Sequence, residues 1–258
     1  MKSIVSRTLS VHKEHEVLLK LEAAGLNDKL AQKIIDSKGN ELATKVVRLI
    51  QNKDLEISIG QKRAREIMDK NFFGIEEAIK YFGVNTARQQ LAALSEIPFS
   101  EAVLKELKDA HILVAVFPLS ILDIRDKVEC KLFCSHEDAW YDKQAFAEDK
   151  NEAFWQLVRK TSVPNSTSKT WDEQQTLLGK DDETPSARVM TYVIIGHYLA
   201  TGERLFDNIY VRTSSFSSDG RHVDVSSFGR DGLGFNDFWD DSPRSDIGLA
   251  SARKVQSH

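Results

Sequence analysis

The sequence has little or nothing of several features that define large classes of protein. Its 258 residues include two cysteines, Cys130 and Cys134, which cannot supply a disulfide framework. No apolar run approaches the roughly 18 residues needed to span a bilayer, and the first residues lack the apolar stretch of a secretory signal. We therefore expect no membrane span and a cytoplasmic location.

A strong excess of basic residues is also missing. Residues 1–97 carry 16 Lys and Arg against 13 Asp and Glu, and residues 98–258 carry 19 against 26, which gives a net charge of −4. Proteins that bind a phosphate backbone usually present a basic surface. Nucleic acid is therefore not an expected partner, and a helix-turn-helix over residues 76–94 is the less favoured interpretation.

The most informative absence lies near the end of the chain. Lys, Glu, Gln and Met make up 52 of the 258 residues, yet none of them occurs between Arg204 and Arg253. The same 50 residues contain nine serines and five glycines. Strands use fewer Lys and Glu, but this preference does not remove four residue types completely. A restriction beyond solubility or secondary structure therefore acts on this segment.

Periodicity of the apolar residues predicts the secondary structure. Helices are expected over 17–35, 40–51, 60–69, 75–82, 88–94, 100–110 and 171–178, and a long one begins at Thr184-Pro185 and ends at Gly202. Asn27 is the expected N-cap within the first range, and Gly39 and Gly83 are expected helix ends. Strands are expected over 112–117, 128–133, 155–159, 209–212, 223–227 and 249–252. The predicted fold class is α+β, with a small α-helical region over residues 1–97 and a second domain over residues 98–258.

Two groups of residues contain the atom types of metal ligands, but their spacing is wrong. The first is Cys130, Cys134 and His136, which lacks the second ligand pair of a structural zinc site. The second is the acidic series Asp237, Asp240, Asp241 and Asp246, whose spacing differs from that of an EF-hand. No cofactor is predicted, and calcium binding by the acidic series is kept as an alternative.

A search for catalytic motifs does not predict an enzyme. No G-x-S-x-G nucleophile elbow is present, and His222 with Asp219 or Asp224 is a weak constellation for a polar loop. His197 lies on an apolar helix face, which is typical of a partly buried structural histidine. The segment from Gly229 to Gly234 has no following helix and is interpreted as a turn rather than a phosphate loop.

The segment from Tyr210 to Lys254 resembles the end of a C-type lectin-like domain, in particular the formylglycine-generating-enzyme branch of that fold. The resemblance rests on an arginine-bearing strand, glycine turns, an aromatic-acidic loop and a closing strand, here Val211-Arg212, Asp219-Gly220, Asp231-Gly232-Leu233, Phe238-Trp239-Asp240 and Gly248 to Arg253. It implies that residues 98–258 form a C-type lectin-like domain of short antiparallel strands, helices and long loops. Residues 135–258 contain no cysteine, so the oxidase activity of that branch is not implied.

Within that fold, the restricted composition is similar to that of the variable proteins of diversity-generating retroelements. In that family the adenines of a template repeat are randomised and written into the end of the gene. An AAC or AAT codon randomised at its first two positions cannot encode Lys, Glu, Gln, Met or Trp. The resemblance implies a variable segment at about residues 220–250, in which Trp239 would belong to the constant scaffold.

This resemblance implies a non-enzymatic protein that presents a hypervariable ligand-binding surface to an unknown protein or other macromolecular ligand. The residues expected to contact the ligand are Ser226, Phe228, Arg230, Phe235, Asn236, Asp237, Phe238, Asp241, Arg244 and Ser245. Exposed Ser, Asn, Asp and Arg with a few aromatic rings suit adaptable recognition, as in antibody loops. For Phe228 and Phe238, burial in the core is an equally supported alternative.

Two other functions are kept as alternatives. The first is a calcium-dependent lectin or hydrolase-like enzyme on the same fold, although the Glu-Pro-Asn or Gln-Pro-Asp loop of calcium-dependent sugar binders is absent. The second is a helical assembly or interaction protein. A homo-oligomer formed through the helical region is compatible with either the leading or the assembly hypothesis.

Overall fold

The computed structural model describes residues 10–36, 60–135 and 138–255. These residues belong to two compact units, Met1–Glu56 and Ile57–His258. The domain boundary predicted at residue 97 is therefore wrong, because the helices between residues 61 and 93 contribute Ala64, Met68, Ala78 and Phe82 to the core of the larger unit. The expected helix over 40–51 and the expected stop at Gly39 lie outside the described residues.

The described part of the smaller unit, residues 10–36, contains two helices, α1 (Val11–Ala23) and α2 (Asp28–Ile35). Ser10 caps α1 through a hydrogen bond from the Lys13 amide to its hydroxyl. Asn27 caps α2 in the same way, by accepting a hydrogen bond from the Leu30 amide over 3.1 Å. The helix expected to begin after Asn27 and to carry Leu30 to Ile35 is therefore confirmed as α2.

The larger unit contains two sheets. Among the described residues, five strands form the first sheet in the order β1-β2-β3-β9-β4, with only β1 and β2 parallel. Its strands are β1 (Phe72–Phe73), β2 (His111–Val116), β3 (Phe154–Arg159), β4 (Asp182–Glu183) and β9 (Ala252–Arg253). Every residue of β2 is buried, which agrees with the continuous apolar run that predicted this strand.

The second sheet carries the C-terminal segment. Its strands are β5 (Tyr210–Phe216), β6 (His222–Gly229), β7 (Gly232–Asn236) and β8 (Ile247–Leu249), in the order β7-β6-β5-β8. β5 and β6 form an antiparallel hairpin, whereas β8 runs parallel to β5. The strands of this domain are therefore mixed rather than uniformly antiparallel.

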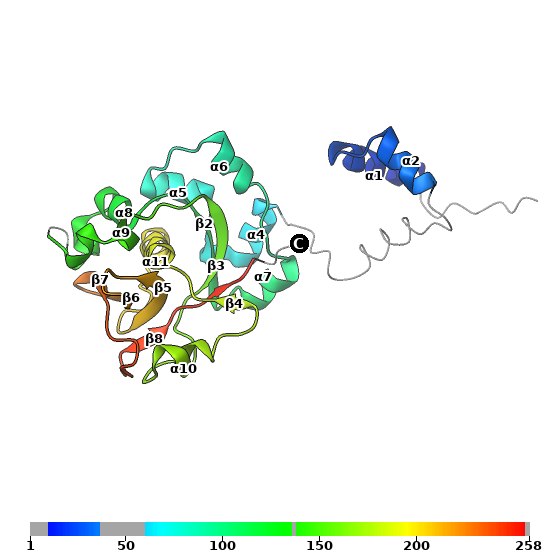
Figure 1. The fold of residues 1–258 in the computed structure, drawn as a ribbon. Helices are drawn as coiled ribbons and strands as arrows, with labels where there is room; N and C mark the ends of the chain where they lie inside the picture. The colour runs from blue at the N-terminus through cyan, green and yellow to red at the C-terminus, as the bar shows by residue number, and fades with distance from the viewer. Residues whose placement is uncertain (1–9, 37–59, 136–137, 256–258) are drawn as a thin grey trace, which may run out of the picture. The chain divides into compact units, whose positions relative to one another are not determined.

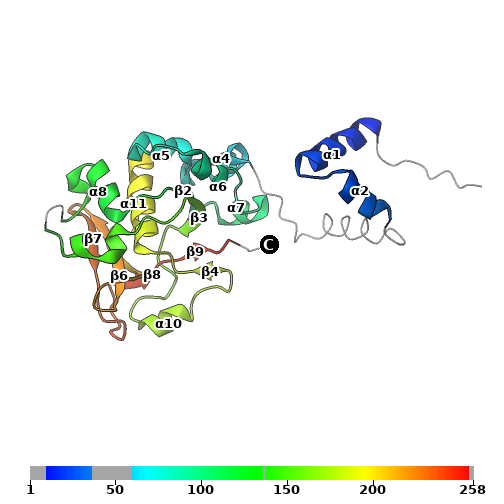
Figure 2. The same cartoon turned by 45° about the horizontal axis from the view of Figure 1, so that its top comes forward.

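Helix α11 (Ala187–Thr201) forms the centre of the larger unit. Its residues from Ala187 to His197 are all buried, and it contacts β1 and β2 of the first sheet as well as β5 and β6 of the second. In Figure 1 it is seen end on between the two sheets, and Figure 2 shows it lengthwise. The Ser186 hydroxyl caps the helix, not Thr184, and Gly202 ends it in a left-handed conformation.

The remaining helices cover the outside of this core. They are α4 (Gln61–Met68), α5 (Ile75–Phe82), α6 (Arg88–Ala93), α7 (Glu101–Leu107), α8 (Ile121–Lys127), α9 (Ala145–Glu148) and α10 (Trp171–Gln175), with short 3-10 helices at Asp69–Asn71, Cys130–Leu132 and Trp140–Lys143. Both an α+β class and the helices predicted over 60–110 are confirmed. The strand predicted over 128–133 is wrong, because Cys130–Leu132 forms a helical turn and only Phe133 makes a bridge, to Leu233.

The segment from Gly229 to Gly234 is more than the turn that the sequence predicted, because β7 begins at Gly232. The backbone of Gly232 has φ +94°, and a Cβ atom there would lie 2.7 Å from the carbonyl carbon of Phe133. The amide and the thiol of Cys134 donate hydrogen bonds to Leu233 O and Gly232 O, over 3.0 and 3.1 Å. The backbone of this strand therefore lies directly against residues 132–134.

We expect Gly232→Ala to destabilise the larger unit by roughly 1–3 kcal/mol, because it adds both backbone strain and a collision with main chain. Gly229→Ala is the matched control, since its Cβ would lie 3.5 Å from the nearest atom, Asp207 O. Urea denaturation measures both variants. Equal stability of the two variants would contradict this account of β7.

Candidate functional site

Two loops bring aromatic and arginine side chains together beside the second sheet. One is the β5–β6 turn, with Phe216 and Arg221, and the other is the loop after β7, with Phe238, Trp239 and Arg244; we call these five residues the aromatic surface. Trp239 is 61% exposed and Phe216 is 55% exposed, which is unusual for side chains of this size. Exposed aromatic residues rimmed by polar groups are typical of an interaction site.

The arginines of this surface lie over aromatic rings. The guanidinium carbon of Arg221 is 3.8 Å from the centre of the Trp239 ring, and that of Arg244 is 4.1 Å from the centre of the Phe238 ring. Arg244 also forms a two-point ion pair with Asp246, at 3.0 and 2.9 Å. These contacts restrict the exposed side chains before any ligand arrives.

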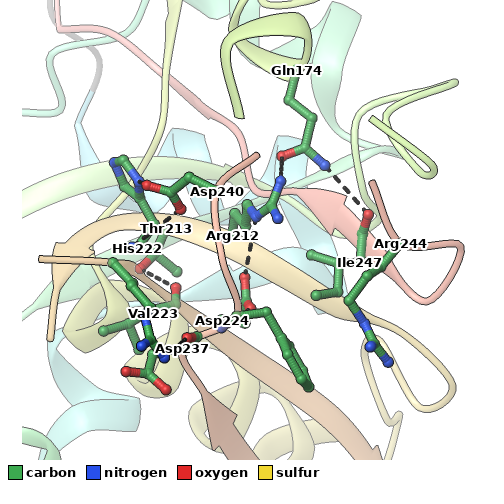
Figure 3. Close-up of polar contacts among 12 residues, drawn as sticks. Gln174, Arg212, Thr213, His222, Val223, Asp224, Asp237, Asp240, Arg244 and Ile247 are labelled. Atoms are coloured by element: carbon green, nitrogen blue, oxygen red, sulfur yellow. Dashed lines mark hydrogen bonds and ion pairs between the residues drawn. The ribbon is translucent and has the colours of Figure 1, made fainter. Parts of the chain in front are cut away.

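The side chain of Arg212 forms hydrogen bonds with the backbone of the loop after β7. This side chain is fully buried on β5, and its Nη2 donates hydrogen bonds to Trp239 O at 3.0 Å and Ser242 O at 3.2 Å. Its Nη1 donates to Lys169 O at 3.2 Å and to the Gln174 side chain at 3.3 Å. Figure 3 shows Arg212 with Gln174 beside it. One buried guanidinium on β5 thus joins the loop after β7 to Lys169 and to Gln174 of α10, which are distant from that loop in sequence.

Gln174 completes this network from α10. The side chain is fully buried, and its amide nitrogen donates hydrogen bonds to Ser166 O and to Ile247 O, the first residue of β8. Thr170 caps α10 and fixes its position, as the sequence predicted. The helix is therefore tied both to the sheet and to Arg212.

A second buried charge, Asp224, lies across from Arg212 on β6. Its Oδ1 is 3.8 Å from Arg212 Nε, and neither atom has a hydrogen-bond partner. Its Oδ2 accepts a hydrogen bond from the Phe238 amide over 3.4 Å. Burial raises the pKa of this carboxyl to about 7, against the opposing effect of Arg212. The proton on Asp224 is therefore linked directly to the loop that carries Trp239.

His222 connects the two loops of the aromatic surface. Its Nδ1 is 2.7 Å from Asp240 Oδ2, and its ring stacks on Trp171 with 3.5 Å between ring centres. Phe216 contacts the same imidazole at 4.3 Å between ring centres. The constellation of His222 with Asp219 or Asp224 considered from the sequence is therefore replaced by the pair with Asp240.

A shallow hollow of about 280 Å³ adjoins this pair. It is lined by Thr170, Trp171, Asp172, Asp240 and Asp241. With the aromatic surface it gives this end of the domain both aromatic and acidic contact groups.

The structure exposes part of the ligand-binding set predicted from the sequence. Arg230, Asp241 and Ser245 are exposed, and Asn236, Asp237, Phe238 and Arg244 are half-buried. Of these, Phe238 and Arg244 belong to the aromatic surface, and Asp241 lines the adjoining hollow. Arg230 lies apart from them, beyond the end of β6.

Three predicted ligand-binding residues are buried, so their prediction as surface contacts is wrong. Ser226 lies at a bulge in β6 with φ 111°, and its hydroxyl bonds inward to Phe206 O. Phe228 packs on Tyr198 with 5.2 Å between ring centres.

Phe235 packs on Tyr141 at 4.5 Å between ring centres. Phe228 and Phe235 are buried because the packing of each ring removes a large apolar area from water.

Several residues of the site were not predicted. Gln174 and Phe216 carry no local sequence signal, because their roles depend on segments that meet only in the folded chain. Arg212 was noted only as part of the arginine-bearing strand of the resemblance, and its buried network was not predicted. Trp239 was assigned to the constant scaffold and not to the ligand-binding set, and its side chain is 61% exposed. Trp171 was predicted only as a helix residue.

The described residues that were considered as metal ligands do not form one cluster, and two of them pair with other side chains. In the described part of the chain, no group of three or more His, Cys, Asp or Glu side chains is placed to hold a metal ion. Asp240 pairs with His222 and Asp246 pairs with Arg244. Cys130 and Cys134 are free and exposed, and His136 lies outside the described residues.

His197 is a buried residue of α11. Its Nε2 is 3.3 Å from Glu203 Oε2, and burial lowers the pKa of its imidazole. This agrees with the structural role predicted from its apolar helix face.

Within the described ranges, no helix is long and apolar enough to cross a membrane. Comparison of the chain with protein-family models, with curated proteins and with solved structures found no match.

Proposed function

We propose that this is a non-enzymatic binding protein whose aromatic surface contacts a protein or other macromolecular ligand. The scaffold is taken to be a C-type lectin-like domain. The exposed positions of residues 220–250, except the constant Trp239, are taken to vary as in the variable proteins of diversity-generating retroelements. The proposal rests on the sequence resemblance together with the geometry of the two loops.

The observation that carries the proposal is that Trp239 is exposed on a loop whose backbone is hydrogen-bonded by the buried Arg212. Tryptophan and arginine are the residues most often found at the energetic centre of protein interfaces. Here Arg221 lies against the ring, and Arg212 binds the backbone of the same loop. A rigid loop loses little conformational freedom on binding, which favours affinity.

The restricted composition is compatible with different roles for the buried and the exposed residues of this segment. Buried residues such as Arg212, Asp224 and Phe235 maintain the sheet and its loops, while exposed residues such as Asp241 and Ser245 contact solvent. Exposed loop positions tolerate substitution because they carry few packing contacts. Diversification of the exposed positions alone would leave the fold intact.

The neighbouring DNA tests the proposal. We expect a near-repeat of the codons around residues 220–254 beside a reverse transcriptase gene, with differences confined to adenines of the repeat. The differing codons should encode exposed or half-buried residues, such as Arg230, Asn236, Asp237, Asp241 and Ser245. The codons of Phe228 and Phe235 serve as internal controls and should match the repeat.

Two results would contradict the proposal. One is the absence of such a repeat near the gene. The other is a repeat whose differences fall on core codons or on bases other than adenine.

A further inference from the structure

The hollow beside the aromatic surface is lined by one aromatic ring and three carboxylates. These belong to Trp171, Asp172, Asp240 and Asp241, and Thr170 completes the lining. Among the described residues, no lysine, arginine or histidine lines it. At about 280 Å³ the hollow is smaller than the roughly 300–1,000 Å³ pockets that hold drug-sized ligands. Its size therefore suits one side chain of a partner better than a separate small molecule.

Two of the three carboxylates are available to a partner. Asp240 is engaged by His222, whose Nδ1 lies 2.7 Å from Asp240 Oδ2 (Figure 3). Asp172 and Asp241 are exposed, and their side chains form no ion pair or hydrogen bond within the described residues. Even a protonated His222 would leave two of the three negative charges uncompensated. The hollow is therefore complementary in charge to a basic partner.

The aromatic ring of the hollow is fixed in place before any ligand binds. Only one face of the Trp171 ring is available, because the His222 imidazole covers the other, with ring centres 3.5 Å apart and planes 19° from parallel. The Trp171 amide donates a hydrogen bond to Asp240 O over 2.8 Å. The ring and the Asp240–Asp241 stretch are thus held together, which lowers the conformational cost of binding.

A neighbouring group in the same loop shows what a ring and a carboxylate hold together. Arg244 lies over the Phe238 ring, 4.1 Å from its centre, and forms a two-point ion pair with Asp246. A guanidinium satisfies both groups because it is planar, stacks on a ring and matches the two oxygens of a carboxylate. The hollow offers the same combination of groups without a guanidinium of its own.

We propose that the hollow binds the guanidinium of an arginine on a protein partner, stacked on Trp171 and paired with Asp172 and Asp241. This assignment rests on the proposed function, because it names the partner chemistry of that surface. Trp171 and Asp172 lie outside residues 220–250, whereas Asp241 is one of the exposed positions taken to vary. The ring is therefore constant, and the charge that Asp241 supplies is particular to this chain.

A capped amino acid tests the hollow directly. We expect Nα-acetyl-arginine amide, titrated into the full chain, to shift the indole N–H resonance of Trp171 saturably, with a Kd in the millimolar range because one side chain makes few contacts. That resonance is assigned by its loss in Trp171→Phe. Nα-acetyl-citrulline amide is the matched neutral probe, since it has nearly the same shape without the charge, and it should give no saturable shift.

Removal of the two available carboxylates should weaken binding of the arginine probe. Asp172→Asn combined with Asp241→Asn is expected to raise its Kd by about fivefold or more, because two ion pairs are lost. Asp207→Asn combined with Asp231→Asn is the matched control, since both carboxylates are exposed and neither lines the hollow. The control should bind like the wild type, and urea denaturation should show that both double variants are folded.

Several results would overturn this assignment. They are the lack of a saturable shift with the arginine probe, equal shifts from the arginine and citrulline probes, a shift confined to the Trp239 indole, and equal weakening in the two double variants. Each of these leaves the codon-repeat test of the proposed function standing. Conversely, the absence of a codon repeat would refute diversification without changing how the arginine probe binds.

Discussion

Arg212→Ala is expected to lower the free energy of unfolding of the larger unit by about 3–5 kcal/mol, the usual cost of removing one partner of a buried ion pair. The substitution removes the donor for three backbone carbonyls and for the Gln174 side chain. It also removes the cation whose Nε lies 3.8 Å from Oδ1 of the buried Asp224 carboxylate. Urea denaturation followed by circular dichroism measures the loss.

Arg230→Ala is the matched control for this experiment. Arg230 lies in the turn between β6 and β7 of the same sheet and is exposed, and surface substitutions of this kind usually change stability by less than about 0.5 kcal/mol. If Arg212→Ala prevents folding, Arg212→Lys takes its place, because one ammonium group cannot reach all four acceptors.

Hydrogen exchange at residues 237–246 should then be faster in the lysine variant than in the wild type. An Arg212→Ala protein as stable as Arg230→Ala, with unchanged exchange in this loop, would show that Arg212 does not hold the loop.

The second large effect concerns Asp224 and pH. The pKa of this carboxyl is raised from 3.8 to about 7 in the folded protein. Between these values the folded state keeps a proton that the unfolded state has released. The contribution of Asp224 to stability is therefore greatest below pH 4 and decreases as pH rises toward 7, by up to about 1.4 kcal/mol per pH unit.

Another buried group acts in the opposite direction, so a difference measurement is needed. Burial lowers the pKa of the His111 imidazole to about 4, so its contribution to stability increases as pH rises from about 4 to 6.5. Asp224→Asn removes the carboxyl and leaves His111 in place. The variant should gain roughly 2–3 kcal/mol relative to the wild type when pH is raised from 5 to 8.

Asp246→Asn is the control, because this carboxyl is half-exposed and its pKa is lowered by Arg244. Its stability relative to the wild type should be nearly constant between pH 5 and 8. A constant difference for Asp224→Asn over the same range would mean that Asp224 is ionised throughout.

The two substitutions should also be coupled. At pH 8 the removal of Arg212 exposes the full cost of an unpaired buried carboxylate, whereas at pH 5 Asp224 is neutral. Arg212→Ala should therefore be less damaging at pH 5 or in the presence of Asp224→Asn. The stability of the contacts around the loop that carries Trp239 would then depend on the protonation state of Asp224.

Local residue patterns were sufficient for most of the helices. Asn27, Ser100 and Thr170 cap helices where the sequence placed them, and Gly83 ends α5. Capping and apolar periodicity act within one or two helical turns, so they can be found without the fold. The same is true of β2, whose buried run is continuous in sequence.

Patterns failed where a residue's environment came from a distant segment. Residues 128–133 have alternating side chains, but they turn to cover β7 and do not join a sheet as a strand. Residues 61–93 have the helices that were predicted, yet their Met68 and Phe82 belong to the core of the larger unit. Periodicity identifies a buried helix face but not the surface against which it packs.

The sequence by itself determined the α+β class, the positions of most helices and the exclusion of four residue types from the C-terminal segment. Only the tertiary structure decided which residues of that segment face water. Phe228 and Phe235 are buried by Tyr198 and Tyr141, and Arg212 is held by carbonyls more than 25 residues away. Burial and long-range hydrogen bonding are properties of the packed chain, because the groups involved become neighbours only after folding.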